Sequence, residues 1–157
     1  MQPKRLSPSE AKQKIYRYCA YQERSHKEVR DKLYEYGLYK SDVEDILSTL
    51  ITDGFLNEER FAKAFAGGKF RMQHWGRLKI VNELEGKGLT KNCIKIGMKE
   101  IEDDAYIQTL REILQKKSRQ LEEKNPFIKR DKVARYAIQK GFEPELVWTH
   151  VKELVKD

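Results

Sequence analysis

Basic and aromatic side chains concentrate in one stretch of the 157-residue chain. Residues 60–82 contain no Asp or Glu. The stretch holds six basic side chains and one tryptophan: Arg60, Lys63, Lys69, Arg71, Trp75, Arg77 and Lys79. Arginine suits paired hydrogen bonds to phosphate or carboxylate groups, and tryptophan offers a face on which bases stack. We predict that these residues form a basic face that binds an acidic protein surface or nucleic acid.

A structural reading of the same stretch stays open. Basic residues commonly coat a solvated helix face, and Trp75 precedes a turn at which it can pack between repeats. The formal net charge of +7 and the pI near 9.3 favour a polyanionic partner. A second basic cluster is weaker because acidic residues interrupt it; its members are Lys116, Lys117, Arg119, Lys129, Arg130, Lys132 and Arg135.

Residue patterns typical of catalytic, metal or cofactor chemistry are missing from the sequence. His26, His74 and His150 fall at no metal-ligand spacing. Gly67 and Gly68 stand inside a helical pattern, without the lysine and serine of a phosphate-binding loop. We therefore expect no enzyme activity and no cofactor. Each glycine costs about 1 kcal/mol in a helix, so the pair predicts a kink or break, with a functional hinge as the alternative.

The cysteines and the hydropathy of the chain bear on its location. Cys19 and Cys93 lack the spacing of a zinc site or a disulfide framework, and we expect both to be buried thiols. Residues 1–9 lack the apolar stretch of a secretory signal, and nowhere do eighteen apolar residues follow one another. We expect a cytoplasmic monomer with no membrane partner.

Three glycines mark an internal repeat that must position the basic residues. Gly37, Gly88 and Gly141 lie 51 and 53 residues apart. Apolar residues recur at the same offsets from each glycine, at −8, −4, +1, +6 and +13: Val29, Leu33, Leu38, Val43 and Leu50; Ile80, Leu84, Leu89, Ile94 and Ile101; Val133, Ala137, Phe142, Val147 and Leu154. This spacing predicts a helix, a turn with a left-handed glycine and a second helix in each unit.

A further helix precedes each pair, which gives three helices per repeat. We predict an all-α fold of three tandem three-helix repeats, at residues 1–54, 55–102 and 103–157, stacked into an elongated curved rod. Ser7 and Ser25 begin the first two helices, and the third repeat opens with a long helix over residues 103–124.

The chain resembles the RecX family of recombination regulators. The residues that carry the resemblance are Arg24, Ser25, Glu28, Val29, Lys32, Leu33 and Gly37, then the run 54–62, then Gly76, Ile80, Glu83, Leu84, Lys87, Gly88 and Leu89. The third repeat matches through its periodicity and the turn at residues 140–142. The resemblance implies a non-enzymatic regulator in DNA repair and recombination. Such a protein lies in the groove of the RecA filament on DNA and limits the filament's ATPase and recombinase activities.

A direct DNA-binding helix-turn-helix module is the competing hypothesis. In such a module one helix enters the major groove and reads base edges. The segment 43–51 is strongly apolar on one face, however, and Asp42, Glu44 and Asp45 would repel phosphate on another. The sequence leaves open whether the chain also touches single- or double-stranded DNA.

Overall fold

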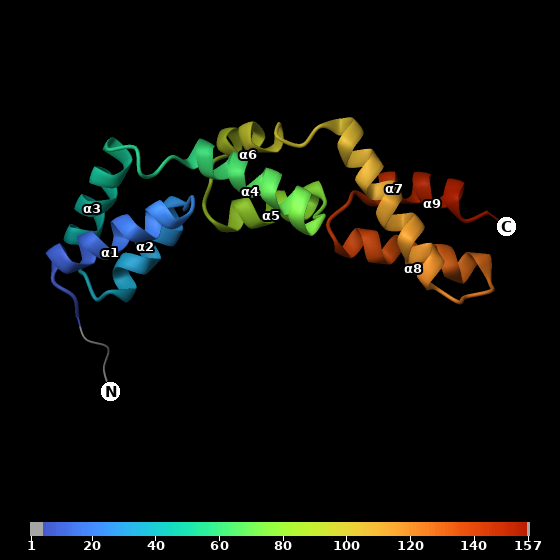
Figure 1. The fold of residues 1–157 in the computed structure, drawn as a ribbon, viewed down its shortest axis with the longest axis horizontal. Coiled ribbons are helices and arrows are strands. Elements are labelled where there is room, and N and C mark those ends of the chain that lie inside the picture. Colours follow the sequence, from blue (N-terminus) through green and yellow to red (C-terminus); the bar gives the residue numbers. More distant parts are fainter. Residues whose placement is uncertain (1–4, 157) are drawn as a thin grey trace. The chain divides into compact units, whose positions relative to one another are not determined.

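The protein, seen in a computed structural model that describes residues 5–156, consists of helices joined by turns and loops in the described part of the chain (Figure 1). Its helices are α1 (Pro8–Tyr21), α2 (His26–Glu35), α3 (Lys40–Thr52), α4 (Glu58–Gln73), α5 (Arg77–Gly86), α6 (Lys91–Met98), α7 (Asp103–Gln120), α8 (Pro126–Gln139) and α9 (Pro144–Leu154). The predicted all-α fold of tandem three-helix repeats is confirmed. Among the described residues no helix is long and apolar enough to cross a membrane.

Polar side chains fix where the helices begin. The Ser7 hydroxyl accepts the Glu10 backbone N–H at the start of α1. At α2 the Ser25 hydroxyl accepts the Glu28 N–H while the Glu28 carboxylate accepts the Ser25 N–H, a complete capping box. These contacts satisfy amides that have no partner inside the helix. Both predicted helix starts are confirmed.

The three repeat glycines end their helices in the same way. Gly37, Gly88 and Gly141 have φ values of +90°, +80° and +101°, which side chains with a Cβ rarely adopt. In each turn the N–H of the residue after the glycine reaches back to the carbonyl of the apolar residue four before it. The three bonds are Leu38 to Leu33, Leu89 to Leu84 and Phe142 to Ala137. The predicted helix–turn–helix units are confirmed.

The described residues form two compact units. The first contains the residues up to Ala64 together with Leu84–Gly97, and the second contains Phe65–Glu83 together with the residues from Met98 onward. Each unit therefore holds one outer repeat and a part of the middle repeat. The stacking of all three repeats into a curved rod stays a prediction.

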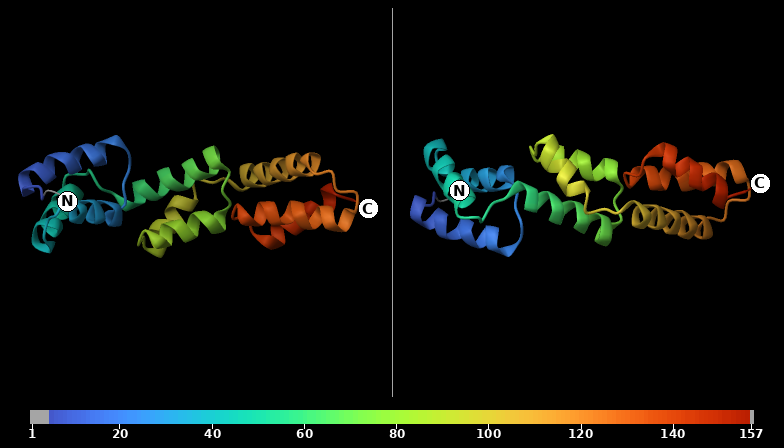
Figure 2. Two further views of the ribbon diagram at one scale, coloured as in Figure 1. Left: turned by 90° about the horizontal axis from the view of Figure 1, so that it is seen from below. Right: turned by 90° about the horizontal axis from the view of Figure 1, so that it is seen from above.

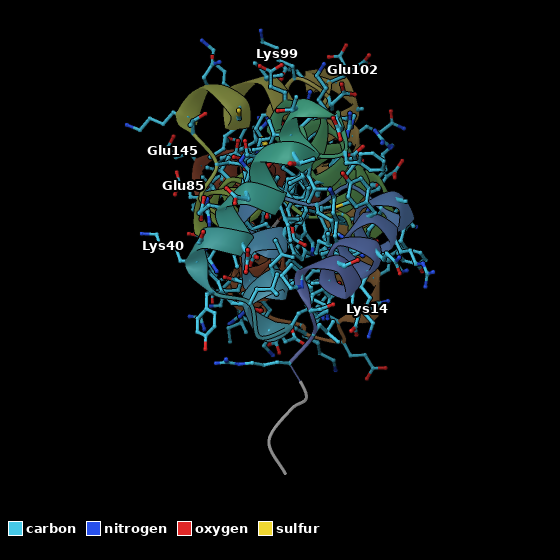
Figure 3. All side chains as sticks on the ribbon, turned by 90° about the vertical axis from the view of Figure 1, so that its left-hand side faces the viewer. Lys14, Lys40, Glu85, Lys99, Glu102 and Glu145 are labelled. Atoms are coloured by element: carbon cyan, nitrogen blue, oxygen red, sulfur yellow. The ribbon has the colours of Figure 1, made fainter. Side chains whose placement is uncertain are left out.

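The core of the first unit lies among α1, α2 and α3. Its buried residues come from every predicted apolar stripe of the first repeat: Ala11, Ile15, Cys19, Val29, Leu33, Leu38, Val43, Ile46, Leu47, Leu50 and Leu56. Tyr16 packs edge-on against Phe55, with ring centroids 4.6 Å apart. Charged side chains stay outside this core, as Lys14 and Lys40 do in Figure 3.

The core of the second unit is built on α7, which lies beside α8 and α9 in both views of Figure 2. Tyr106 of α7 is fully buried and stacks on Phe142 with ring centroids 4.9 Å apart. Phe70 of α4 lies 5.8 Å from the Tyr106 ring. Leu110 and Leu114 continue the same buried face of α7.

The turn at Gly141 also caps α5. The N–H groups of Gly76 and Leu78 donate to the carbonyls of Lys140 (2.7 Å) and Gly141 (2.9 Å). The approach is so close that a Cβ on Gly76 would lie 2.2 Å from the Gly141 carbonyl carbon. The glycines at both positions are therefore required by the packing of the second unit.

Two predicted helix features are wrong. The break predicted at Gly67 and Gly68 is absent, since α4 runs unbroken to Gln73, while the kink and the hinge stay predictions. The rest of the buried face of α4 outweighs the weak helix propensity of two glycines. The helix predicted over residues 103–124 ends at Gln120. Glu122 and Glu123 would lie at its C-terminus, where the helix dipole disfavours negative charge.

Two predicted burials are also corrected. Leu154 is half-buried, and its neighbour Val155 takes the buried place at the end of the third repeat. Cys19 is buried as predicted, but Cys93 is half-buried. Burial raises the pKa of the Cys19 thiol to about 11.

Candidate functional site

The seven residues of the predicted basic face fall into different environments. Arg60 and Lys63 belong to the first unit, while Lys69, Arg71, Trp75, Arg77 and Lys79 belong to the second. These residues also differ in how many carboxylate side chains pair with them. Some of these side chains hold the fold together, and others leave their charge available to a partner.

Arg60 is part of the structure of the first unit. Its Nε lies 2.5 Å from Glu23 Oε1, and its guanidinium also donates to the Gly54 carbonyl at 3.0 Å. The neighbouring Glu58 carboxylate lies 3.0 Å from Nδ1 of His26. Two residues of the run that carries the family resemblance thus join α4 to the first repeat. Lys63 is exposed, and no ion pair of the described residues involves it.

Arg77 is held on three sides in the second unit. One terminal nitrogen lies 3.0 Å from Glu143 Oε2 and the other 2.7 Å from Asp103 Oδ1. The guanidinium stacks over the Tyr106 ring at 3.8 Å, and the Arg77 backbone N–H donates to the Tyr106 hydroxyl at 2.9 Å. That hydroxyl donates in turn to Glu143 Oε1. Two carboxylates and one ring of the second unit therefore tie the Arg77 guanidinium to the fold.

The Tyr106 hydroxyl keeps its proton because the site is buried. Desolvation is the largest cause that raises its pKa, and the hydrogen bond to Glu143 and the charge of that carboxylate raise it further. The hydroxyl thus remains a donor to Glu143 and an acceptor from Arg77 over the whole ordinary pH range. This buried network positions the start of α5 against α7.

Trp75, Lys69 and Lys79 form the part of the predicted face that stays cationic. The two ammonium nitrogens lie 4.8 Å and 4.3 Å from the centroid of the half-buried Trp75 ring. Phe65 supports the indole edge-on, with centroids 6.3 Å apart. Among the described ion pairs neither lysine has a carboxylate partner. An aromatic face orders a cation without cancelling its charge, so this cluster can still attract an anion.

Arg71 is the fourth basic residue of the predicted face in the second unit, besides Lys69, Arg77 and Lys79. Its side chain is exposed and folds back along α4, so that a Cβ on Gly67 would lie 2.8 Å from both terminal guanidinium nitrogens. Because Gly67 has no side chain, the guanidinium of Arg71, one turn later in α4, can lie against the helix there.

The sequence analysis missed a basic and aromatic surface in the first repeat. Arg24 lies 3.7 Å over the Tyr18 ring and 6.0 Å from that of Tyr21, which is 82% exposed. Lys32 lies 5.7 Å and 5.8 Å from the rings of Tyr18 and Tyr36. The signal was present in the composition, because six of the eight tyrosines precede residue 40.

Metal chemistry finds no support in the described part of the chain. No group of three His, Cys, Asp or Glu side chains there is close enough to hold a metal ion. Glu44 and Arg30 illustrate how the acids are used. Their hydrogen bond at 2.9 Å is the main cause that lowers the pKa of the Glu44 carboxyl. The site chemistry is that of charge and stacking.

Three family models match the chain in order. "RecX, first three-helix domain" matches residues 11–50, "RecX, second three-helix domain" residues 57–98, and "RecX, third three-helix domain" residues 104–151. The matched ranges contain most of every helix of the described chain. The order of the three matches is also the order predicted from the glycine turns.

Known relatives carry the name "Regulatory protein RecX". The protein from Listeria monocytogenes EGD-e is 26% identical over 133 residues, which are 85% of this chain and 49% of the relative. The chain thus spans about half the length of the curated relatives it matches first, although the Prosthecochloris aestuarii protein is matched over 99% of its length at 26% identity. The crystal structure of RecX from Lactobacillus salivarius superposes with a TM-score of 0.82 at 22% identity, covering 94% of this chain and 96% of that one.

Proposed function

The chain belongs to the RecX family of regulatory proteins, and from this premise we propose that it binds the RecA filament on DNA and limits its ATPase and recombinase activities. It does so by contact alone, without catalysing a reaction. Polar and charged contacts spread over three repeats suit a partner that is itself a repeating polymer, because several weak contacts to neighbouring subunits add up to useful avidity.

The observation that carries the proposal is the cationic cluster at Trp75. Lys69 and Lys79 lie over an indole face, and the exposed Arg71 follows Lys69 by two residues on α4. Such a cluster attracts acidic side chains of a protein groove or phosphates of DNA that the groove encloses. Arg60 and Arg77 do not belong to this proposed contact, because carboxylates of the fold already neutralise them.

The competing function, a helix-turn-helix that reads bases, has less support. In the first repeat the helix after the glycine turn is α3, and its Glu44 pairs with Arg30 while Asp42 and Asp45 add negative charge. A helix of this composition is repelled by the phosphates that flank a major groove. Basic residues elsewhere in the chain are ordered by stacking on aromatic rings.

Parallel binding measurements test the proposal. Affinity for RecA-coated single-stranded DNA is compared with affinity for the same DNA free of protein, and inhibition of the RecA ATPase is followed in the same buffer. A regulator prefers the coated form, whereas equal affinity for both forms would favour the direct DNA-binding module.

A charge-reversal variant tests the contact surface. Lys69→Glu, Arg71→Glu and Lys79→Glu together should abolish or strongly weaken inhibition at low salt. The matched control carries the same charge change at exposed residues of the first unit, Lys12→Glu, Lys14→Glu and Lys40→Glu. Circular dichroism checks that both variants fold. Full inhibition by the folded Trp75-cluster variant would refute the assignment of this surface.

A further inference from the structure

We propose that a small pocket of the second unit binds a backbone phosphate of single-stranded nucleic acid, with a base of the same strand stacked on Tyr136. The pocket has a volume of about 160 Å³. One lining residue follows α4 directly, and the others come from α7 and from the end of α8. The lining residues are His74, Ile113, Lys116, Lys117, Gln120, Tyr136 and Lys140.

The charge of the lining selects an anion. Three of the seven lining residues are lysines and none is acidic. Two acidic residues close to the lining in sequence are directed to other groups. Glu123 lies 3.5 Å from the Lys132 ammonium, and Glu112 accepts a hydrogen bond from Gln108 at 3.2 Å. Neither of these carboxylates forms an ion pair with a lysine of the pocket.

The ammonium groups are ordered by neutral partners. Lys117 Nζ lies 4.6 Å from the centroid of the Tyr136 ring, and Lys140 Nζ lies 5.8 Å from it. Lys140 also donates to the carbonyl of Gln73 at 3.2 Å. A cation held by a ring and a carbonyl is positioned without being neutralised, and two such cations on one tyrosine converge on the same anion.

His74 adds an independent observation. It is the one residue other than glycine with positive φ in the described chain, at +57°. The N–H of the following Trp75 donates to the Lys69 carbonyl at 3.2 Å, one residue further back than in the turns at Gly37, Gly88 and Gly141. Gly37, Gly54, Gly88 and Gly141 occupy the other left-handed positions. His74 stands where glycine would be less strained and lines a basic pocket, which indicates a use for its ring.

The volume decides the size of the ligand. Pockets that enclose drug-sized molecules occupy roughly 300–1,000 Å³, so 160 Å³ holds one phosphate group but not a whole nucleotide. The rest of the ligand must lie outside the pocket. Tyr136 is 39% exposed at its rim, so part of its ring is accessible to the adjacent base. A strand with unpaired bases meets both requirements, and a duplex, whose bases are stacked on one another, meets only the first.

Anisotropy of a fluorescent oligothymidylate bound to the full chain, measured over a series of salt concentrations without RecA, tests the proposal. Lys116→Gln, Lys117→Gln and Lys140→Gln together should weaken binding and reduce the slope of log K against log salt by about 0.7, the value for one phosphate of a single strand. Tyr136→Ala should lower affinity roughly tenfold or more and leave that slope unchanged.

Controls separate this site from general charge and from other sources of phosphate. Neutralising the exposed lysines Lys99, Lys124 and Lys152 changes the net charge equally and should preserve most of the affinity. Inorganic phosphate and thymidine monophosphate should compete only weakly, and a duplex of equal length should bind less tightly than the single strand. Equal losses in both triple variants, or a mononucleotide that binds as tightly as the oligomer, would overturn the proposal. Because RecA is absent, either result is independent of the proposed function.

Discussion

Replacement of Arg77 by alanine separates the residues that hold the fold from those available to a partner. Arg77 lies in the basic stretch that the sequence assigns to binding, yet its guanidinium contacts Glu143, Asp103 and the Tyr106 ring. Arg77→Ala removes all three contacts and leaves the half-buried Glu143 carboxylate with only the Tyr106 hydroxyl. We expect a loss of stability, and not primarily a loss of binding.

The magnitude follows from the exposure of each partner. Arg77 and Glu143 are both 30% exposed, and a hydrogen bond between charged groups in such a place contributes about 1.5–3 kcal/mol. Asp103 is 92% exposed, so its pair contributes only about 0–1 kcal/mol. Stacking over Tyr106 adds about 0.5–2 kcal/mol. Since the three contacts share one side chain and are not additive, we expect a total loss of about 2–4 kcal/mol.

Urea and thermal unfolding of the full chain measure this loss. One kcal/mol corresponds to about 2–4 °C in Tm for a chain of this size. Lys79→Ala is the matched control, because it removes a neighbouring cation that only stacks on Trp75, and it should cost about 0.5–1 kcal/mol. Arg77→Lys should fall between the two, since an ammonium cannot reproduce the fork of a guanidinium. Equal stability of the Arg77→Ala and Lys79→Ala proteins would refute the assignment of Arg77 to the fold.

Four further outcomes are expected. Leu84→Ala should destabilise the chain by roughly 2–5 kcal/mol in urea unfolding, because Leu84 is fully buried; a neutral effect would contradict the repeat register. Gly76→Ala should cost at least about 1–3 kcal/mol, since its Cβ meets the backbone of Gly141, and an unchanged Tm would disprove that close approach. His74→Gly should raise stability by about 1 kcal/mol through relief of the left-handed φ while weakening oligonucleotide binding, and lower stability would contradict the strain. The folded state raises the pKa of the Cys19 thiol from 9.0 to about 11, so the contribution of this thiol to the free energy of unfolding is complete below pH 9 and is lost as the pH rises toward 11. Cys19→Ala should therefore flatten the decline of the urea midpoint at alkaline pH. The same pH profile for both proteins would count against the burial of Cys19.

The sequence predicts the repeats because their signals are local. Leu33, Leu84 and Ala137 stand four residues before their glycines, and the hydrogen bonds that close the turns span five residues. The Ser25 capping box likewise acts within one turn of α2. Such contacts are encoded by neighbours in the chain, so periodicity and cap residues suffice to place them.

The roles of the basic residues depend on distant partners and are not accessible in this way. Arg60 meets Glu23 across 37 residues, and Arg77 meets Glu143 across 66. Nothing in the run 60–82 distinguishes these two arginines from Lys69 or Lys79. Only the fold shows which cations are paired with carboxylates and which lie over aromatic rings.

This distinction explains how a chain with 25 acidic and 32 basic residues can present cationic surfaces. Acids and bases that pair across the fold cancel locally, as at Arg60 and Arg77. The lysines that remain effective are those held by Trp75 and Tyr136, where a ring restricts the side chain at little cost to its charge. A binding surface of this kind depends on aromatic residues as much as on basic ones, so the ring substitutions Trp75→Ala and Tyr136→Ala probe it without any change in net charge.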